Sequence, residues 1–401
     1  MLSAKASKLH FSSLVFDTHS DSLARTVDHE EDLGTDTGRG HMDIPRMLAG
    51  NQRAQFFAAY VDPAGFGVEQ SMERITDYFD AFDTLCINYP NQIEQARTAD
   101  DVRKITESGK IAGILCVEGG HAMTDDLDIL RLFQKRGVRY MTLTHNMSNN
   151  WADGIQDESG SEAPTDWSIL KEQFLNQGWI KTTKRHNGLT DFGREVVQEM
   201  NSLGIIVDIS HVARKTFWDV METTSKPVMA SHSSSWSICQ NPRNIDDDQL
   251  KAVSQNNGVA CVNFEVTFIS QKCNQETREV DRWRDSEISK LHASEPENTS
   301  ALELIKKEHA KRSAPLLRKP VYTEIVDHID HMVRVAGIDH VGIGSDFDGS
   351  RTPTGMEDCT RVPFLTEEMI NRGYSDTDIQ KILGLNVLRV MEQVVDNTLV
   401  T

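Results

Sequence analysis

The chain has 401 residues and a formal net charge of −19. A charge of this sign repels phosphate backbones, so we expect no nucleic-acid partner. No stretch approaches the roughly 20 apolar residues of a membrane-spanning helix, so we expect no membrane partner. The N-terminus lacks the apolar core of a secretory signal and the polar C-terminus does not suit a lipid anchor, which predicts a cytoplasmic protein.

Apolar runs alternate with helical patterns along the chain. The runs predict eight strands, over 13–17, 54–61, 111–117, 138–144, 204–210, 227–231, 258–264 and 340–346. The periodicity between them predicts helices over 68–87, 124–136, 190–203, 212–224, 245–257, 321–336 and 375–393. This alternation is typical of α/β proteins with a parallel sheet, and eight such strands predict a closed (β/α)8 TIM-like barrel.

Two segments depart from this rhythm. Residues 146–188 are polar and predict a long loop after the fourth strand, and such loops are usually functional or disordered. Residues 268–319 are highly charged, and part of them has a helical pattern. We interpret this stretch as a charged helical insertion between strands 7 and 8, within a single barrel domain that spans residues 1–401.

Potential metal ligands follow several of the predicted strands. In a (β/α)8 barrel the carboxyl ends of the strands meet at one face, so residues that are distant along the chain would converge there. Imidazole and carboxylate groups bind zinc and similar divalent ions. The pattern therefore predicts a metal hydrolase. The residues are His19, Asp21, Glu118, His145, His211, His232 and Asp346.

The spacing of these residues predicts how they could share metal ions. His19 and Asp21 stand two residues apart at a strand end, where both side chains could reach one metal. His211 and His232 end consecutive strands and could share a second metal. Glu118 has two carboxylate oxygens and could bridge both ions. Nearby serines and Asp208 are candidate partners that would orient the imidazole rings.

Three further residues suit the chemistry of hydrolysis. Asp346 ends an apolar run and could take a proton from a metal-bound water and return it to a leaving amine. Asp348 competes for this role, although it also suits a turn before Gly349. His145 could donate a hydrogen bond to a substrate carbonyl. Arg243 could hold a substrate carboxylate with its guanidinium fork, or could form a salt bridge at the start of a helix.

Taken together, these motifs resemble the membrane (renal) dipeptidase family of binuclear zinc peptidases. The matches run in the family's order over most of the chain, so their combination is far more specific than any one motif. They include Asp17-Thr18-His19-Ser20-Asp21, Glu118-Gly119-Gly120, Leu143-Thr144-His145-Asn146, Asp208-Ile209-Ser210-His211, Ser231-His232-Ser233, Asn241-Pro242-Arg243-Asn244 and Gly344-Ser345-Asp346-Phe347-Asp348-Gly349.

The resemblance implies a distorted (β/α)8 barrel of the metal-dependent hydrolase type, and it also implies a metal site and a reaction. It implies two zinc ions per subunit, with His19 and Asp21 on one, His211 and His232 on the other, and Glu118 between them. By the same likeness His145 contacts the scissile carbonyl, Arg243 holds the substrate's C-terminal carboxylate, and Asp346 handles the proton. Trp151 and Asp153 would lie near the substrate entrance. The implied reaction is hydrolysis of dipeptides, including those with a C-terminal D-residue, by a metal-bridging hydroxide in a homodimeric enzyme.

Some features depart from the family's pattern. Animal members are secreted, disulfide-bonded and lipid-anchored, and none of those signals is visible here, so the chain resembles a soluble microbial-type member. Glu265 follows Val262-Asn263-Phe264 where some members carry a tyrosine. An acid at that position could alter recognition of the substrate's carboxylate end.

Two other functions remain open from the sequence. One is a different amidohydrolase-type enzyme that acts on a cyclic amide or a lactone. Many such enzymes bridge their metals with a modified lysine on the fourth strand, but residues 138–144 contain no lysine. The other is a catalytically inactive barrel kept as a scaffold, which we would expect to have lost some of the ligands.

Overall fold

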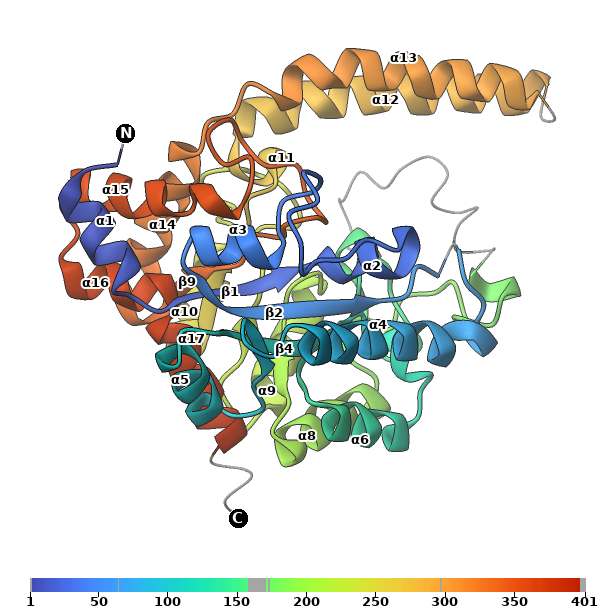
Figure 1. Cartoon of the computed structure of the whole chain (residues 1–401). Coiled ribbons are helices and arrows are strands. Elements are labelled where there is room, and N and C mark those ends of the chain that lie inside the picture. Colours follow the sequence, from blue (N-terminus) through green and yellow to red (C-terminus); the bar gives the residue numbers. More distant parts are fainter. Residues whose placement is uncertain (1, 64, 158–170, 172–173, 296–297, 397–401) are drawn as a thin grey trace.

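A closed barrel of parallel strands forms the centre of the molecule. The computed structural model describes residues 2–63, 65–157, 171, 174–295 and 298–396. The strands follow one another around the ring and helices surround them, as predicted for a (β/α)8 barrel (Figure 1). The eight strands of the ring are β1 (Val15–Ser20), β2 (Gln52–Tyr60), β4 (Ile111–Glu118), β5 (Val138–Thr142), β6 (Ile206–Asp208), β7 (Met229–Ala230), β8 (Val259–Val262) and β9 (Val341–Ile343).

The register of the strands brings their carboxyl ends to one rim. Tyr60 on β2 is paired with Glu118 on β4, and Thr142 on β5 is paired with Asp208 on β6. The side chains that follow these positions therefore gather at one mouth of the barrel. A further strand, β3 (Ile93–Gln95), pairs only with the start of β4, and we did not predict it because three residues carry little periodic signal.

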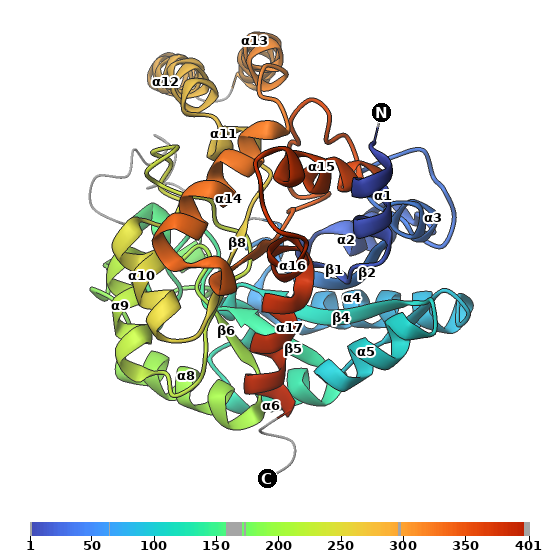
Figure 2. The ribbon, with the colours of Figure 1, turned by 90° about the vertical axis from the view of Figure 1, so that its left-hand side faces the viewer.

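Helices pack around the outside of the ring (Figure 2). Six of them match predicted segments: α4 (Val68–Asn88), α6 (Leu127–Arg136), α8 (Asp191–Leu203), α9 (Arg214–Thr223), α10 (Asp247–Gln255) and α14 (Thr323–Ala336). The helix predicted over 375–393 is divided by a π-helical turn into α16 (Asp376–Gln380) and α17 (Asn386–Met391). We did not predict α1 (Ala4–Phe11), α2 (Ser22–His29), α3 (Ile44–Ala49), α5 (Ala99–Glu107) or α15 (Pro363–Asn371).

Aromatic rings fill the barrel beneath the rim. Phe16 stacks on Phe56 with ring centroids 5.4 Å apart, and Phe56 lies 4.8 Å from Tyr140. All three side chains are fully buried. The hydroxyl of Tyr140 points toward the rim and donates a hydrogen bond to the carbonyl oxygen of Thr18 over 3.0 Å. This aromatic layer forms the floor on which the rim residues stand.

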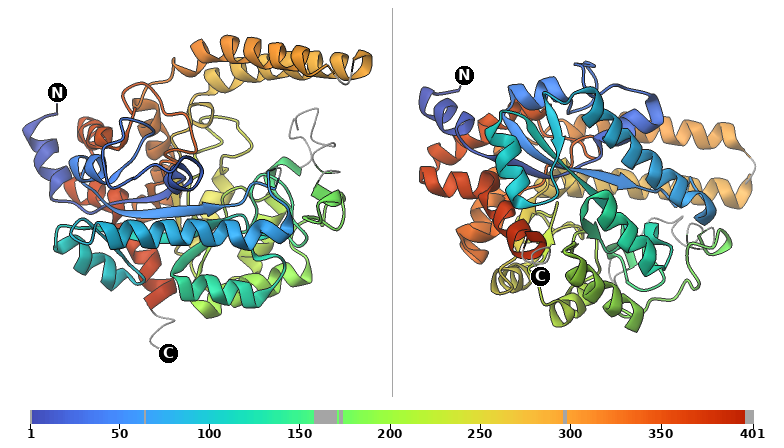
Figure 3. Two further views of the ribbon diagram at one scale, coloured as in Figure 1. Left: turned by 45° about the vertical axis from the view of Figure 1, so that its right-hand side comes forward. Right: turned by 60° about the horizontal axis from the view of Figure 1, so that its bottom comes forward.

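The segment after β8 forms an extended pair of helices. After the short α11 (Val266–Ile269), α12 (Gln271–Ser294) and α13 (Thr299–Leu317) lie side by side and project from the barrel (Figures 1 and 3). We call this pair the hairpin. Arg312 of α13 lies over the ring of Trp283 of α12, with the guanidinium carbon 3.8 Å from the ring centroid. Its place within a single domain stays a prediction.

Part of the predicted loop over 146–188 lies outside the described residues, namely 158–170 and 172–173. The described part contains a short 3₁₀ helix, Ile155–Asp157. None of the described helices is long and apolar enough to cross a membrane.

Candidate metal centre

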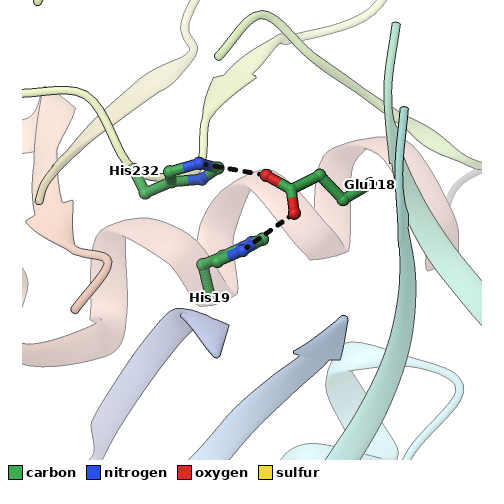
Figure 4. A group of neighbouring side chains, drawn as sticks. All are labelled: His19, Glu118 and His232. Carbon is green, nitrogen blue, oxygen red and sulfur yellow. Dashed lines mark ion pairs between the residues drawn. The ribbon is translucent and has the colours of Figure 1, made fainter. Parts of the chain in front are cut away.

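The rim of the barrel brings the five predicted metal ligands into one cluster around Glu118. One oxygen of Glu118, Oε1, lies 3.0 Å from His211 Nε2 and 3.4 Å from His232 Nε2. The other, Oε2, lies 3.6 Å from His19 Nε2, which is also 3.6 Å from Asp21 Oδ2. Figure 4 shows His19, Glu118 and His232 pointing toward one another from different parts of the barrel. The cluster therefore joins residues that are up to 213 positions apart in sequence.

The hydrogen bonds of His19 show which of its ring nitrogens carries the proton when the ring is neutral. Its Nδ1 lies 2.6 Å from the hydroxyl of Tyr140, and that hydroxyl already donates its hydrogen to Thr18. His19 Nδ1 must therefore be the donor, and Nε2 carries only a lone pair in the neutral ring. The side chain is fully buried, and Nε2 has no hydrogen-bond partner.

His211 and His232 have the same arrangement. His211 Nδ1 donates to Asn146 Oδ1 over 2.8 Å, and His232 Nδ1 donates to Ser231 Oγ over 2.7 Å. The hydroxyl of Ser231 in turn donates to Asp208 over 2.7 Å, so the predicted partnership with a serine and Asp208 is confirmed for the ring of His232. The two Nε2 atoms face each other at 2.8 Å. In these neutral rings neither Nε2 carries a hydrogen to share.

This donor set fits a divalent cation. Three unprotonated ring nitrogens and two carboxylates converge, and lone pairs at such distances repel one another unless a positive charge lies between them. Imidazole nitrogen and carboxylate oxygen are the ligands that zinc and similar ions take in proteins. A metal-binding histidine usually donates its other ring N–H to an oxygen atom outside the metal centre, as the three rings here donate to a hydroxyl or an amide oxygen.

The pKa values of the cluster also indicate a site for positive charge. Burial, together with neighbouring carboxylates, raises the pKa of Glu118 to about 8 and that of Asp346 to about 7, against the opposing effect of His19 and Arg243. Burial alone would lower the pKa of His19, but Glu118, Asp21 and Asp346 raise it to about 10. These carboxylates therefore favour a positive charge beside them, which either a proton on His19 Nε2 or a bound cation supplies, and only with a cation is the His19 ring neutral. Burial lowers the pKa of His211 and His232 well below its usual range. The centre is thus acidic and electron-rich, with two rings kept neutral.

Two of the clustered residues have a strained backbone. His211 and Asp346 adopt positive φ angles of 68° and 61°, in the left-handed region that non-glycine residues rarely occupy. Asp346 is held there because its N–H donates to the carbonyl oxygen of His19 and its Oδ2 accepts from Asn263 over 2.9 Å. The nearby residue 349 is a glycine because any larger residue would place its Cβ only 1.9 Å from Asp21 Oδ2. Strain of this kind is common at functional sites.

Asp348, the competing candidate, lies in a structural network instead. Its carboxylate accepts hydrogen bonds from Ser22 Oγ over 2.5 Å and from the N–H of His41 over 2.6 Å. It also pairs with Arg25 over 3.3 Å. These contacts tie α2 to the loop after β9, which supports the choice of Asp346 over Asp348 for proton transfer.

A cavity of about 1200 Å³ opens above the cluster. Arg243 lies in its wall and is 9% exposed, and its guanidinium donates to the carbonyl oxygen of His232 over 3.3 Å. Burial lowers the pKa of Arg243 to about 10, so the group stays charged at neutral pH. Among the described residues it forms no salt bridge of the kind considered from the sequence, and Asp346, Glu118 and Asp208 act on it only through their charge. Its charge therefore faces the cavity.

His145 lies in the same wall, with its ring 4.6 Å from that of His211. Its Nδ1 is 3.3 Å from the hydroxyl of Tyr60, and burial lowers its pKa to about 3, so the ring is neutral. Tyr60 and Asn263 are site residues that we missed. Both stand at strand ends, so extending the strand-end rule from metal ligands to phenol and amide groups would have found them.

Trp151 and Asp153 do not line this cavity, nor a second, smaller space that His145 also lines. Trp151 is fully buried against Gly120, where a Cβ would lie 2.4 Å from the indole ring. Asp153 is fully buried too and accepts hydrogen bonds from the N–H groups of His186 and Gly188 over 2.9 and 3.0 Å. Both residues stabilise the loop that carries Asn146, and their predicted place near the substrate entrance stays a prediction.

Comparison with known proteins agrees with this geometry. The family model described as Membrane dipeptidase (Peptidase family M19) matches residues 3–400. Dipeptidase tcpJ from Claviceps purpurea (strain 20.1) is 31% identical over 365 residues, which cover 89% of this chain and 70% of that protein. The probable dipeptidase PvdM from Pseudomonas aeruginosa has a similar structure, with a TM-score of 0.81, 26% identity and 98% coverage of both chains.

A second solved structure is also similar. It is a metallo peptidase from Rhodobacter sphaeroides liganded with a phosphinate mimic of the dipeptide L-Ala-D-Ala. Its TM-score is 0.74 and its identity 25%, with 96% of this chain and 100% of that chain covered. The match to the family over almost the whole chain, the barrel and the candidate ligands at its rim lead to one conclusion: this chain belongs to the membrane dipeptidase family, peptidase family M19, and is a metallo-dipeptidase.

Proposed function

We propose that this enzyme hydrolyses the peptide bond of free dipeptides with two zinc ions bound at the rim of the barrel. His19, Asp21, Glu118, His211 and His232 would hold the ions. The observation that carries this proposal is the convergence of three unprotonated ring nitrogens on the carboxylate of Glu118. When bound, divalent ions supply Lewis-acid chemistry that lowers the pKa of water and polarises a carbonyl group.

The other residues of the cavity have distinct roles in this proposal. Arg243 binds the substrate's C-terminal carboxylate through its guanidinium fork, which favours dipeptides over longer chains. His145 donates from Nε2 to the scissile carbonyl oxygen, because Nδ1 faces the hydroxyl of Tyr60. Asp346 takes a proton from the attacking water and delivers it to the amine nitrogen as the carbon–nitrogen bond breaks. The products are two free amino acids.

The proposed substrates include dipeptides with a C-terminal D-residue. The support is the similar metallo peptidase from Rhodobacter sphaeroides, which was solved with a mimic of L-Ala-D-Ala. The cavity that Arg243 lines has a volume of about 1200 Å³, which exceeds that of most small-molecule sites, roughly 300–1,000 Å³, so we expect it to accept a C-terminal side chain in either configuration.

Metal removal and reconstitution test the proposal. Protein treated with a chelator should lose hydrolysis of L-Ala-L-Ala and L-Ala-D-Ala, and zinc should restore it as two ions bind per chain. A tripeptide with the same residues should be a poor substrate. Metal-loaded protein that cleaves no dipeptide, or that cleaves tripeptides equally well, would contradict the proposal.

A further inference from the structure

A second chamber lies beside the metal centre. It has a volume of about 570 Å³, and His145, Asn146 and Gln156 line both this chamber and the cavity over the cluster. The two spaces therefore meet at His145. Arg243 lines the cavity over the cluster but not the chamber. The walls of the chamber come from the barrel loops on one side and from the hairpin on the other.

The barrel side of the chamber has an apolar and aromatic group of side chains beside polar ones, the latter being Asp62, His121, Asn146, Ser148, Asn149 and Gln156. Phe174, Trp179 and Ile180 line it and are all buried, and Tyr60 adds a further ring. The indole Nε1 of Trp179 donates to the carbonyl oxygen of Phe66 over 2.7 Å, so the polar edge of this ring is already occupied. These side chains offer apolar surface to whatever enters the chamber.

The hairpin side offers one apolar side chain, Ile288 of α12, among basic groups. Each basic side chain of this wall pairs with an acid on the hairpin itself: Arg284 with Asp285 (2.8 Å), His309 with Asp281 (2.7 Å) and Lys306 with Glu303 (2.9 Å). Because each of these basic groups is already paired with an acid, the wall does not require a negatively charged ligand. The wall closes the chamber with paired charges and the half-buried Ile288.

We infer that the chamber binds a large apolar side chain on the N-terminal residue of the dipeptide, and that Ile288 on the hairpin is a specificity-determining residue. The inference rests on the proposed function. A dipeptide whose carboxylate lies at Arg243 and whose scissile carbonyl lies at His145 has its N-terminal residue on the His145 side. The chamber opens at that side, so an aromatic or large aliphatic group there exchanges water for apolar surface.

Kinetics on dipeptides that differ only in the N-terminal residue test this assignment. The wild type should hydrolyse Phe-Ala with a kcat/KM at least roughly 10-fold above that for Ala-Ala, because burial of one large apolar side chain is worth that much or more. Ile288→Asp should remove this advantage and leave Ala-Ala within about twofold of the wild type. The matched control is Leu304→Asp, also on the hairpin, where the leucine is 66% exposed and does not line the chamber.

A binding measurement separates the chamber from turnover. Calorimetry on chelator-treated protein should give a lower Kd for Phe-Ala than for Ala-Ala, and Ile288→Asp should abolish the difference. Hydrolysis of Ala-Ala without any preference for Phe-Ala, or an equal effect of Ile288→Asp on both substrates, would overturn the chamber assignment alone. If the metal-loaded wild type cleaves neither substrate, the proposed function fails and this inference fails with it.

Discussion

Replacement of Arg243 by methionine tests the way the enzyme selects a free carboxylate. Among the described residues, this guanidinium donates a single hydrogen bond, to the carbonyl oxygen of His232, and Arg243 lines the cavity. Two charge-assisted bonds to a carboxylate contribute about 1.5–3 kcal/mol each. Because the cavity admits water, we take the lower value for both, or about 3 kcal/mol in total, which corresponds to a roughly 100-fold loss of kcat/KM.

The loss should appear in KM and should depend on the substrate's carboxylate. Arg243→Met should raise the KM for Ala-Ala steeply while zinc content, measured by elemental analysis, stays unchanged. With the amide of Ala-Ala, which has no carboxylate, wild type and variant should have similar kcat/KM values. Arg278→Met is the matched control, because Arg278 on α12 lines the same cavity without a proposed role.

Two results would refute this reasoning. If Arg243→Met lowers activity equally on Ala-Ala and on its amide, the guanidinium acts on the metal centre and not on the substrate. If both kinetic constants for Ala-Ala stay at wild-type values, the carboxylate lies elsewhere in the cavity.

Two further predictions concern metal binding and acid stability. Ser231→Ala removes the hydroxyl that accepts from His232 Nδ1 and should weaken zinc binding roughly 10- to 100-fold, measured in competition with a chelator. Ser233→Ala is the control. Equal zinc affinities in the two variants would contradict the role of Ser231. His10 has its pKa lowered to about 4 by burial. The unfolded chain therefore binds more protons as pH falls from about 6.5 to 4, and wild type should lose about 2 kcal/mol more stability than His10→Asn between about pH 7.5 and pH 5 in urea unfolding. Parallel pH profiles would show that His10 is not the titrating group.

The sequence predicted the barrel and the clustering of ligands for the same physical reason. Strand-end positions are read directly from where apolar runs stop, and a closed parallel barrel makes those ends neighbours whatever their separation in the chain. The residues around Glu118 therefore needed no knowledge of long-range contacts beyond the fold class. Tyr60 at the end of β2 satisfied the same rule and was missed only because the search was limited to metal ligands.

The partners that set the histidine tautomers could not all be predicted in this way. Asn146 reaches His211 from the loop after β5, and Tyr140 reaches His19 from beneath the rim, so neither contact follows from strand ends. The bounds of the predicted insertion, 268–319, agree closely with those of the hairpin, but its division into two long helices was not predicted. Its helices bury few side chains, and pairs such as Lys290 with Glu287 and Arg312 with Glu308 stabilise them instead, so the apolar stripe that marks a helix is weak.

Helix α12 of the hairpin makes two proposed contributions to substrate binding, one near Arg243 and one at the chamber. Asn274, in the first turn of α12, accepts a hydrogen bond from Asn241 over 3.3 Å, and the Oδ1 of Asn241 accepts from the N–H of Arg243 over 3.0 Å. The same helix carries Ile288 about four turns further on, at the chamber. One helix thus supports the loop that bears the arginine proposed to bind the carboxylate and closes the space proposed for the N-terminal side chain. Changes at Ile288 should therefore alter the preferred N-terminal residue, whereas changes at Asn274 should weaken binding of every dipeptide.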